Sequence, residues 1–83
     1  SNLDQLGWGF IEKMYFHFYP EAPNRAYYDP VFKERVFDEM EEIKKDTAWM
    51  ESIKNKANEN HINPTLQLYR DAVWVLNNRK DKQ

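Results

Sequence analysis

The two histidines have the widest chemical use of any side chains in this sequence, because an imidazole can move a proton or bind a metal near neutral pH. His17 and His61 fall on different predicted helices, and neither has a second ligand at a spacing typical of a metal site. The sequence has no cysteine, which excludes disulfides and thiolate metal sites. Four acidic residues at positions 38–42 ride on a regular helix, whereas a calcium loop needs alternating acids around a glycine turn. We therefore expect no metal and no cofactor.

Nucleophilic and phosphate chemistry also lack their usual patterns. Ser52, the only serine besides Ser1, falls in mid-helix with no histidine nearby and no glycine elbow to expose it. Gly7 and Gly9 are the only glycines, too few for a phosphate-binding loop, and their spacing favours helix packing. We therefore expect no enzymatic activity and no small-molecule substrate.

The totals favour a single domain over residues 1–83. The hydrophobic fraction is 41% and the aromatic fraction 16%, and each buried ring removes roughly 150–250 Å² from water, so a core of this size is feasible. No apolar run reaches the ~18 residues of a membrane span, and no signal peptide is visible. We expect no membrane partner and a cytoplasmic location. Residues 1–2 are interpreted as the remnant of a cleaved tag and residues 78–83 as a frayed polar tail.

Hydrophobic spacing predicts an all-α fold in the form of a small four-helix bundle. The helices are expected roughly at residues 3–19, 30–45, 47–60 and 64–77, the last two forming an antiparallel hairpin. Asp29-Pro30 and Asn63-Pro64 each place a capping side chain before a proline in the first helical position. Asp46 or Thr47 can cap the third helix.

The first helix carries more apolar surface than one stripe. Leu3, Leu6, Phe10, Met14 and Phe18 recur at steps of three and four, and Trp8, Tyr15 and Tyr19 form a second set on another flank. Either this helix is the central one of the domain, or part of it contacts a partner.

The connection "FHFYPEAPNRAYYDP" after this helix is unusually aromatic and poor in charge. Its rings can fold back across the open end of the bundle and complete the core. Alternatively, the tyrosines stay partly exposed and form a recognition surface, since Tyr, Trp and Arg are enriched at interface hot spots. We expect most rings to close the core and the remaining ones to mark a partner site.

Trp74 falls outside the apolar arc of the last helix. Arg70, four residues earlier, can stack on its indole as a cation–π contact. The alternative is that Trp74 packs on a neighbouring chain or on the aromatic flank of the first helix. Two helices with surplus apolar surface in a small domain favour self-association or a bound partner.

The net charge of −2 is unevenly distributed, with −4 in residues 1–47 and +2 in residues 48–83. The acidic half argues against a duplex-binding surface across the whole domain, because phosphate neutralisation needs clustered Lys and Arg. The basic half keeps a nucleic-acid-binding module as the alternative function. Its residues would be Lys54, Lys56, Arg70, Arg79, Lys80 and Lys82.

Two DNA-binding patterns fit only in part. In a helix-turn-helix register the turn glycine falls at His61, and the expected apolar positions of the second helix fall at Gln67 and Arg70. The segment "NHINPTLQLYRDAVWVL" resembles the second helix of ribbon-helix-helix proteins, which implies a base-reading β-strand ahead of the first helix. That position here is "DEMEEIKKD", an acidic helix, so the strand is missing.

The sequence thus predicts a small, non-enzymatic, all-α protein–protein interaction domain. Its partner is expected to be another protein or a second copy of itself in a homodimer. The predicted contact residues are Trp8, Tyr15, Tyr19, Tyr27, Tyr28 and Trp74.

Overall fold

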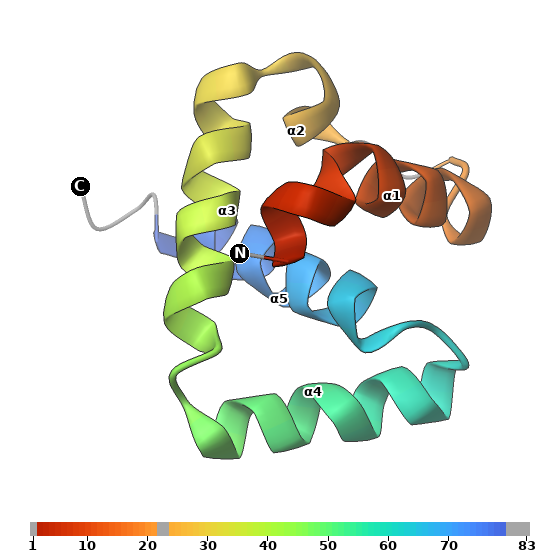
Figure 1. Ribbon diagram of the computed structural model, residues 1–83, viewed down its shortest axis with the longest axis vertical. Helices are drawn as coiled ribbons and strands as arrows, with labels where there is room; N and C mark the ends of the chain where they lie inside the picture. The colour runs from red at the N-terminus through yellow and green to blue at the C-terminus, as the bar shows by residue number, and fades with distance from the viewer. Residues whose placement is uncertain (1, 22–23, 80–83) are drawn as a thin grey trace.

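The computed structural model describes residues 2–21 and 24–79, and for residues 2–8 it describes the backbone alone. Within these ranges the chain has no strand, and the all-α prediction is confirmed. The helices are α1 (Asn2–Phe18), α2 (Arg25–Tyr28), α3 (Pro30–Ile43), α4 (Thr47–Asn60) and α5 (Pro64–Arg79), as Figure 1 shows. The four predicted helices match α1, α3, α4 and α5 to within two residues at each end. Of the predicted tag remnant (residues 1–2) and the predicted frayed tail (residues 78–83), Ser1 and residues 80–83 lie outside the described residues, whereas Asn2 belongs to α1 and Asn78 and Arg79 belong to α5.

Capping side chains fix the starts of α3 and α4. Asp29 accepts a hydrogen bond from the backbone N–H of Phe32 (3.1 Å). Asp46 accepts one from the N–H of Trp49 (3.0 Å), so the cap of α4 is Asp46. Each cap satisfies a backbone donor that the first helical turn leaves unpaired, at a gain of about 1 kcal/mol.

The connection between α1 and α3 differs from the predicted loop, because it contains the one-turn helix α2. Two small or polar side chains of this segment turn inward: Ala26 is buried, and Asn24 accepts a hydrogen bond from the Tyr69 hydroxyl. Tyr27 and Tyr28 instead point outward and are 61% and 71% exposed. These two tyrosines therefore do not close the core, and their exposure agrees with the alternative in which tyrosines of this connection stay exposed.

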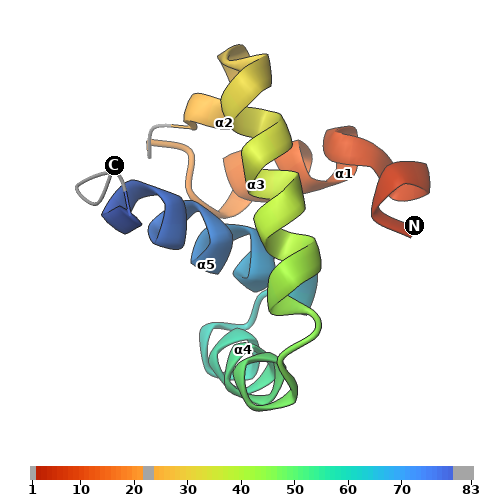
Figure 2. The same cartoon turned by 90° about the vertical axis from the view of Figure 1, so that its left-hand side faces the viewer.

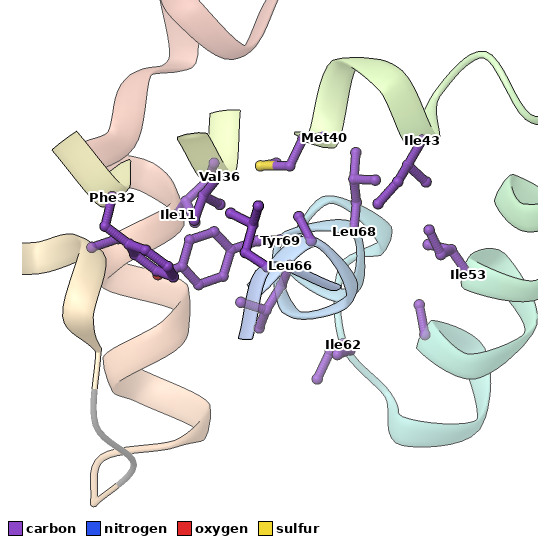
Figure 3. Packing of buried hydrophobic residues seen from close by; sticks show 14 residues of the cluster. Ile11, Phe32, Val36, Met40, Ile43, Ile53, Ile62, Leu66, Leu68 and Tyr69 are labelled. Carbon is purple, nitrogen blue, oxygen red and sulfur yellow. The ribbon is translucent and has the colours of Figure 1, made fainter. Parts of the chain in front are cut away.

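The central helix is α5, which packs against α1, α3 and α4. Figure 3 shows its side chains projecting to both sides, Tyr69 towards Ile11 and Phe32, and Leu68 towards Ile43. Eight residues of α5 are buried. The stability of the domain therefore depends on this helix more than on any other described element.

The helices cross steeply. In Figure 1, α3 runs vertically and α4 horizontally below it, and in Figure 2, α4 is seen end-on while α5 lies across the view. The predicted four-helix bundle with an antiparallel α4–α5 hairpin is not confirmed, because bundle helices lie close to parallel. The domain is nonetheless compact, with a Cα radius of gyration of 12.3 Å, near the ~12 Å expected for this length.

Helix α1 is not central. Ile11 is its one fully buried side chain among residues 9–18, and Met14 and Tyr15 are partly buried beside it. Phe10 and Phe18, which belong to the predicted stripe, are exposed. Among residues 9–18 the buried face of α1 is therefore centred on Ile11, and this part of the helix keeps aromatic surface in contact with solvent.

Candidate binding surface around Trp74

Trp74 is the most prominent apolar side chain on the central helix, and it is 65% exposed. Two hollows lie on either side of it, and Trp74 and Arg70 line both. The larger hollow, of about 540 Å³, lies between α4 and α5 and is called here the α4 hollow. The smaller, of about 370 Å³, is bordered by α1, α2, α3 and α5 and is called the α1 hollow. We call Trp74, Arg70 and the two hollows together the Trp74 surface.

The α4 hollow has an aromatic and polar wall. Besides Arg70 and Trp74, its lining residues are Trp49, Lys56 and Asn60 from α4 and Gln67 and Asp71 from α5. These residues meet because α4 crosses α5 with Ile53 and Ala57 buried in the contact. The polar residues at the edge of that contact then face one another.

Asp71 organises the polar wall of the α4 hollow. Its Oδ2 atom accepts hydrogen bonds from the indole Nε1 of Trp49 (2.9 Å) and from Nζ of Lys56 (2.7 Å). Its Oδ1 atom accepts one from Nε2 of Gln67 (2.8 Å). A largely buried carboxylate needs such donors to offset its lost hydration. The three donors fix both the carboxylate and the indole ring of Trp49.

The charge of Asp71 persists at neutral pH. Burial raises the pKa of a carboxyl group, because the ionised form loses its hydration. At Asp71 the hydrogen bonds from Lys56, Trp49 and Gln67 outweigh burial, and they hold the pKa below its usual value. Lys56 and Asp71 therefore form a neutralising ion pair in the wall of the hollow.

Gln67 contributes an unsatisfied acceptor to the same wall. Its side chain is only 5% exposed, and its Oε1 atom accepts no hydrogen bond from the described residues. A buried polar atom without a partner is rare and costs about 1–3 kcal/mol. This atom is covered in the free domain, so a bound N–H or O–H would reach it only after the Gln67 amide moves.

Arg70 is held by Tyr19 rather than by Trp74. Its guanidinium carbon lies 4.1 Å from the centroid of the Tyr19 ring, and its Nη1 atom donates a hydrogen bond to the Tyr19 hydroxyl (2.7 Å). Arg70 therefore does not make the stacking contact with Trp74 that the sequence predicted. It contacts Tyr19, the residue directly after α1. The indole of Trp74 remains open to solvent.

Tyrosine rings connect the α1 hollow to the core. Tyr15 lines this hollow, and its ring centroid lies 5.7 Å from that of Tyr19 and 5.6 Å from that of Tyr69. Burial raises the pKa of Tyr15, although the nearby charge of Arg70 opposes the shift. The other lining residues of the α1 hollow are Arg25, Phe32, Val73 and Asn77.

The Trp74 surface carries a positive charge on an acidic chain. Three bases, Arg25, Lys56 and Arg70, line the two hollows against one acid, Asp71. Arg25 pairs with Asp29 (3.1 Å) and Lys56 with Asp71 (2.7 Å). Arg70 has no carboxylate partner among the described residues, so its charge is not neutralised.

The structure brings together half of the predicted contact residues. Tyr15, Tyr19 and Trp74 gather around Arg70. Tyr27 packs instead on Phe16, with ring centroids 5.3 Å apart. Tyr28 lines neither hollow.

The side chain of Trp8, the sixth predicted contact residue, lies outside the described residues.

Two basic residues of the nucleic-acid alternative are paired with carboxylates. Lys56 is paired with Asp71, and Arg79 donates to Glu39 (2.8 Å). Lys54 is exposed. Lys80 and Lys82 lie outside the described residues.

The α4–α5 connection is closer to a helix-turn-helix than the sequence suggests. His61 adopts the left-handed conformation (φ 57°) that a turn glycine usually occupies, and Gln67 is buried despite its polarity. However, a recognition helix must present a free face to the major groove. Here α5 is the central helix, and its exposed flank carries Trp74.

No group of three His, Asp or Glu side chains in the described ranges is placed to hold a metal ion. None of the described helices has the length and apolar character needed to cross a membrane.

Gly9 has open space around the position of a Cβ atom, so close helix packing does not explain this glycine.

No known protein-family model, curated protein or solved structure matches this chain significantly.

Sequence reasoning missed the polar wall of the α4 hollow. Trp49 and Asp71 were not among the predicted contact residues, and Gln67 entered only as a position of the helix-turn-helix register. A usable signal was present, because Gln67 and Asp71 are four residues apart and thus share one face of α5. Their donors on α4 depend on how the two helices cross, which local spacing does not specify.

Proposed function

We propose that this protein is a non-enzymatic interaction domain that binds another protein through the Trp74 surface. The observation that carries the proposal is the exposure of the Trp74 indole between two hollows. A tryptophan ring buries roughly 150–250 Å² on contact, and tryptophan is among the residues most enriched at binding hot spots. Leaving such a ring in water is unfavourable for an isolated domain, so a partner that covers it gains that burial.

The helix beneath Trp74 is packed into the domain, which supports a recognition role. Ala72, Val75 and Leu76, its neighbours on α5, are buried in contacts with the rest of the domain. Arg70 beside it is held by Tyr19. A partner therefore meets a surface that is already largely formed, and binding loses little conformational entropy.

Chemistry in the α4 hollow does not favour catalysis. Asp71 is saturated with three hydrogen-bond donors, and its lowered pKa makes it a poor proton acceptor at neutral pH. The hollow therefore offers fixed binding groups rather than a base or a nucleophile.

Selection from a peptide library tests the proposal without knowledge of the natural partner. A random dodecapeptide library displayed on phage is selected on the wild-type domain, and the affinities of the enriched peptides are measured by fluorescence polarisation. Trp74→Ala should weaken binding by at least tenfold, since loss of a hot-spot side chain costs ~2 kcal/mol or more. Circular dichroism should show an unchanged fold, because the ring is exposed.

Tyr28→Ala is the matched control. Tyr28 is as exposed as Trp74 and belongs to the same predicted set, but it lines neither hollow. Its loss should leave peptide binding within twofold of wild type. Peptides that bind Trp74→Ala as tightly as wild type would contradict the proposal, and so would a selection that enriches no peptide.

A further inference from the structure

We infer that the partner presents an acidic peptide segment, with a carboxylate that binds Arg70 and apolar side chains that flank Trp74. This inference rests on the proposed function and names the chemistry of the partner at the same surface. Three observations carry it: the charge left over at Arg70, the unsatisfied acceptor of Gln67, and the pair of hollows that share one ridge.

The charge balance selects an acidic ligand. Arg25 and Lys56 each have a carboxylate partner within the domain, whereas Arg70 is held by a phenol and an aromatic ring. A guanidinium has five N–H donors, and only one of those on Arg70 has a described acceptor. A carboxylate fits the remaining donors in a forked geometry.

The acceptor of Gln67 favours a peptide over a simple anion. Its Oε1 atom needs a donor, which an anion lacks. A peptide carries backbone N–H groups as well as carboxylates. One segment can therefore bind Arg70 and, once the Gln67 amide moves to uncover its oxygen, satisfy Gln67 as well.

The arrangement of the hollows favours a chain over a compact small molecule. Trp74 and Arg70 form a ridge shared by the α4 hollow and the α1 hollow. A peptide that crosses this ridge can place one apolar side chain in each hollow while its carboxylate meets Arg70. A compact ligand would occupy one hollow and leave the other face of the indole in water.

Charge-matched peptide libraries test this inference. Three phage-displayed dodecapeptide libraries each have two positions restricted to Leu or Phe. The other positions draw on Asp and Glu in the acidic library, on Asn and Gln in the neutral library, and on Lys and Arg in the basic library. The wild-type domain should enrich peptides from the acidic library, and their binding should weaken as salt rises. Replacing Asp and Glu in the best peptide by Asn and Gln should weaken binding about tenfold or more.

Variants of the domain provide the reciprocal test. Arg70→Gln should weaken binding of the acidic peptide about tenfold, whereas Arg35→Gln, the same change at an exposed position of α3, should have no effect. Asn77 is exposed and lines the α1 hollow, so Asn77→Lys should strengthen binding and Asn77→Asp should weaken it. The Asn77 pair keeps the test decisive even if Arg70→Gln unfolds the domain.

The outcomes separate this inference from the proposed function. Peptides that need Trp74 but bind equally well in neutral form overturn the acidic partner and leave the interaction domain intact. Enrichment from the basic library, or an Asn77→Lys variant that binds more weakly, also overturns it. If light scattering shows a wild-type dimer that Trp74→Ala dissociates, the occupant is a second copy of this chain and the inference is wrong.

Discussion

Trp49 donates its indole N–H to the carboxylate of Asp71 over 2.9 Å, and this bond joins α4 to the central helix α5. Lys56 reaches the same oxygen from the next turns of α4. The polar wall of the α4 hollow is thus also a structural clamp, because both donors come from one helix and the acceptor from another. The Trp74 surface depends on this clamp for its shape.

Removal of the Asp71 carboxylate should destabilise the domain. Asp71→Asn replaces a charged acceptor of three hydrogen bonds by a neutral amide, which leaves Lys56 without its ion pair. We expect a loss of about 1–3 kcal/mol in the free energy of unfolding. Urea denaturation measures it, with Asp38→Asn, an exposed acid on α3, as the control. Equal stability of Asp71→Asn and wild type would show that the clamp is not structural.

Stability should fall in acid, and Asp71 should account for part of the fall. The pKa of Asp71 lies below the usual 3.8 in the folded state. As the pH falls, Asp71 therefore takes up a proton in the unfolded state before it does so in the folded state. The stabilisation is present above pH 3.8 and is lost as the pH falls through the lower pKa of the folded state. Hydrogen bonds from the Phe32 N–H and from Arg25 lower the pKa of Asp29 as well. Protonation of Asp29 therefore adds to the loss of stability in the same pH range.

Urea denaturation between pH 6 and pH 2 measures this dependence. Asp71→Asn should make the loss of stability smaller in acid than it is in wild type. If the free energy of unfolding fell equally with pH in the two proteins, the lowered pKa of Asp71 would be contradicted.

Gly9→Ala should stabilise the domain. Gly9 lies within α1, and a Cβ atom built there meets nothing within 4 Å. Alanine favours the helix by about 0.5–1 kcal/mol over glycine. Thermal unfolding followed by circular dichroism should show a Tm higher by a few degrees. A lower Tm would mean that Gly9 is held in close contact after all.

The C-terminal turn of α5 should contribute to stability through Arg79. Its guanidinium meets the largely buried carboxylate of Glu39 on α3, with Nη1 2.8 Å from Oε1. Arg79→Gln leaves that carboxylate without its ion pair and should cost about 1 kcal/mol, a value reduced by the exposure of Arg79. Chemical denaturation measures the loss, and Arg35→Gln should cost much less. No loss in Arg79→Gln would indicate a frayed helix end.

Local signals in the sequence specified the helices well. Asp29 before Pro30, and Asp46 three residues before Trp49, act through hydrogen bonds within three residues of the chain. The end of α5 was placed too early, since its last turn is held by Glu39, forty residues away in sequence. A polar segment at the end of a helix is predicted as a frayed tail unless the distant residue that pairs with it is known.

The candidate site was only partly predictable for the same reason. Trp74 was singled out because it breaks the apolar pattern of its helix, and it is indeed exposed. Its expected neighbour Arg70 turned out to contact Tyr19, 51 residues earlier. Tyr27 and Tyr28 were predicted contact residues and are exposed, but the one-turn helix α2 buries Ala26 in the core, and neither tyrosine lines a hollow.

Chemical-shift mapping of the ¹⁵N-labelled domain with the best acidic peptide tests the central claim most directly. We predict that the largest changes fall on the Trp74 indole N–H and on the backbone N–H groups of Arg70, Val73 and Asn77. Glu34 and Asp38 on the outer face of α3 should be unaffected. Changes confined to α3, with the Trp74 indole unmoved, would contradict the Trp74 surface as the binding site.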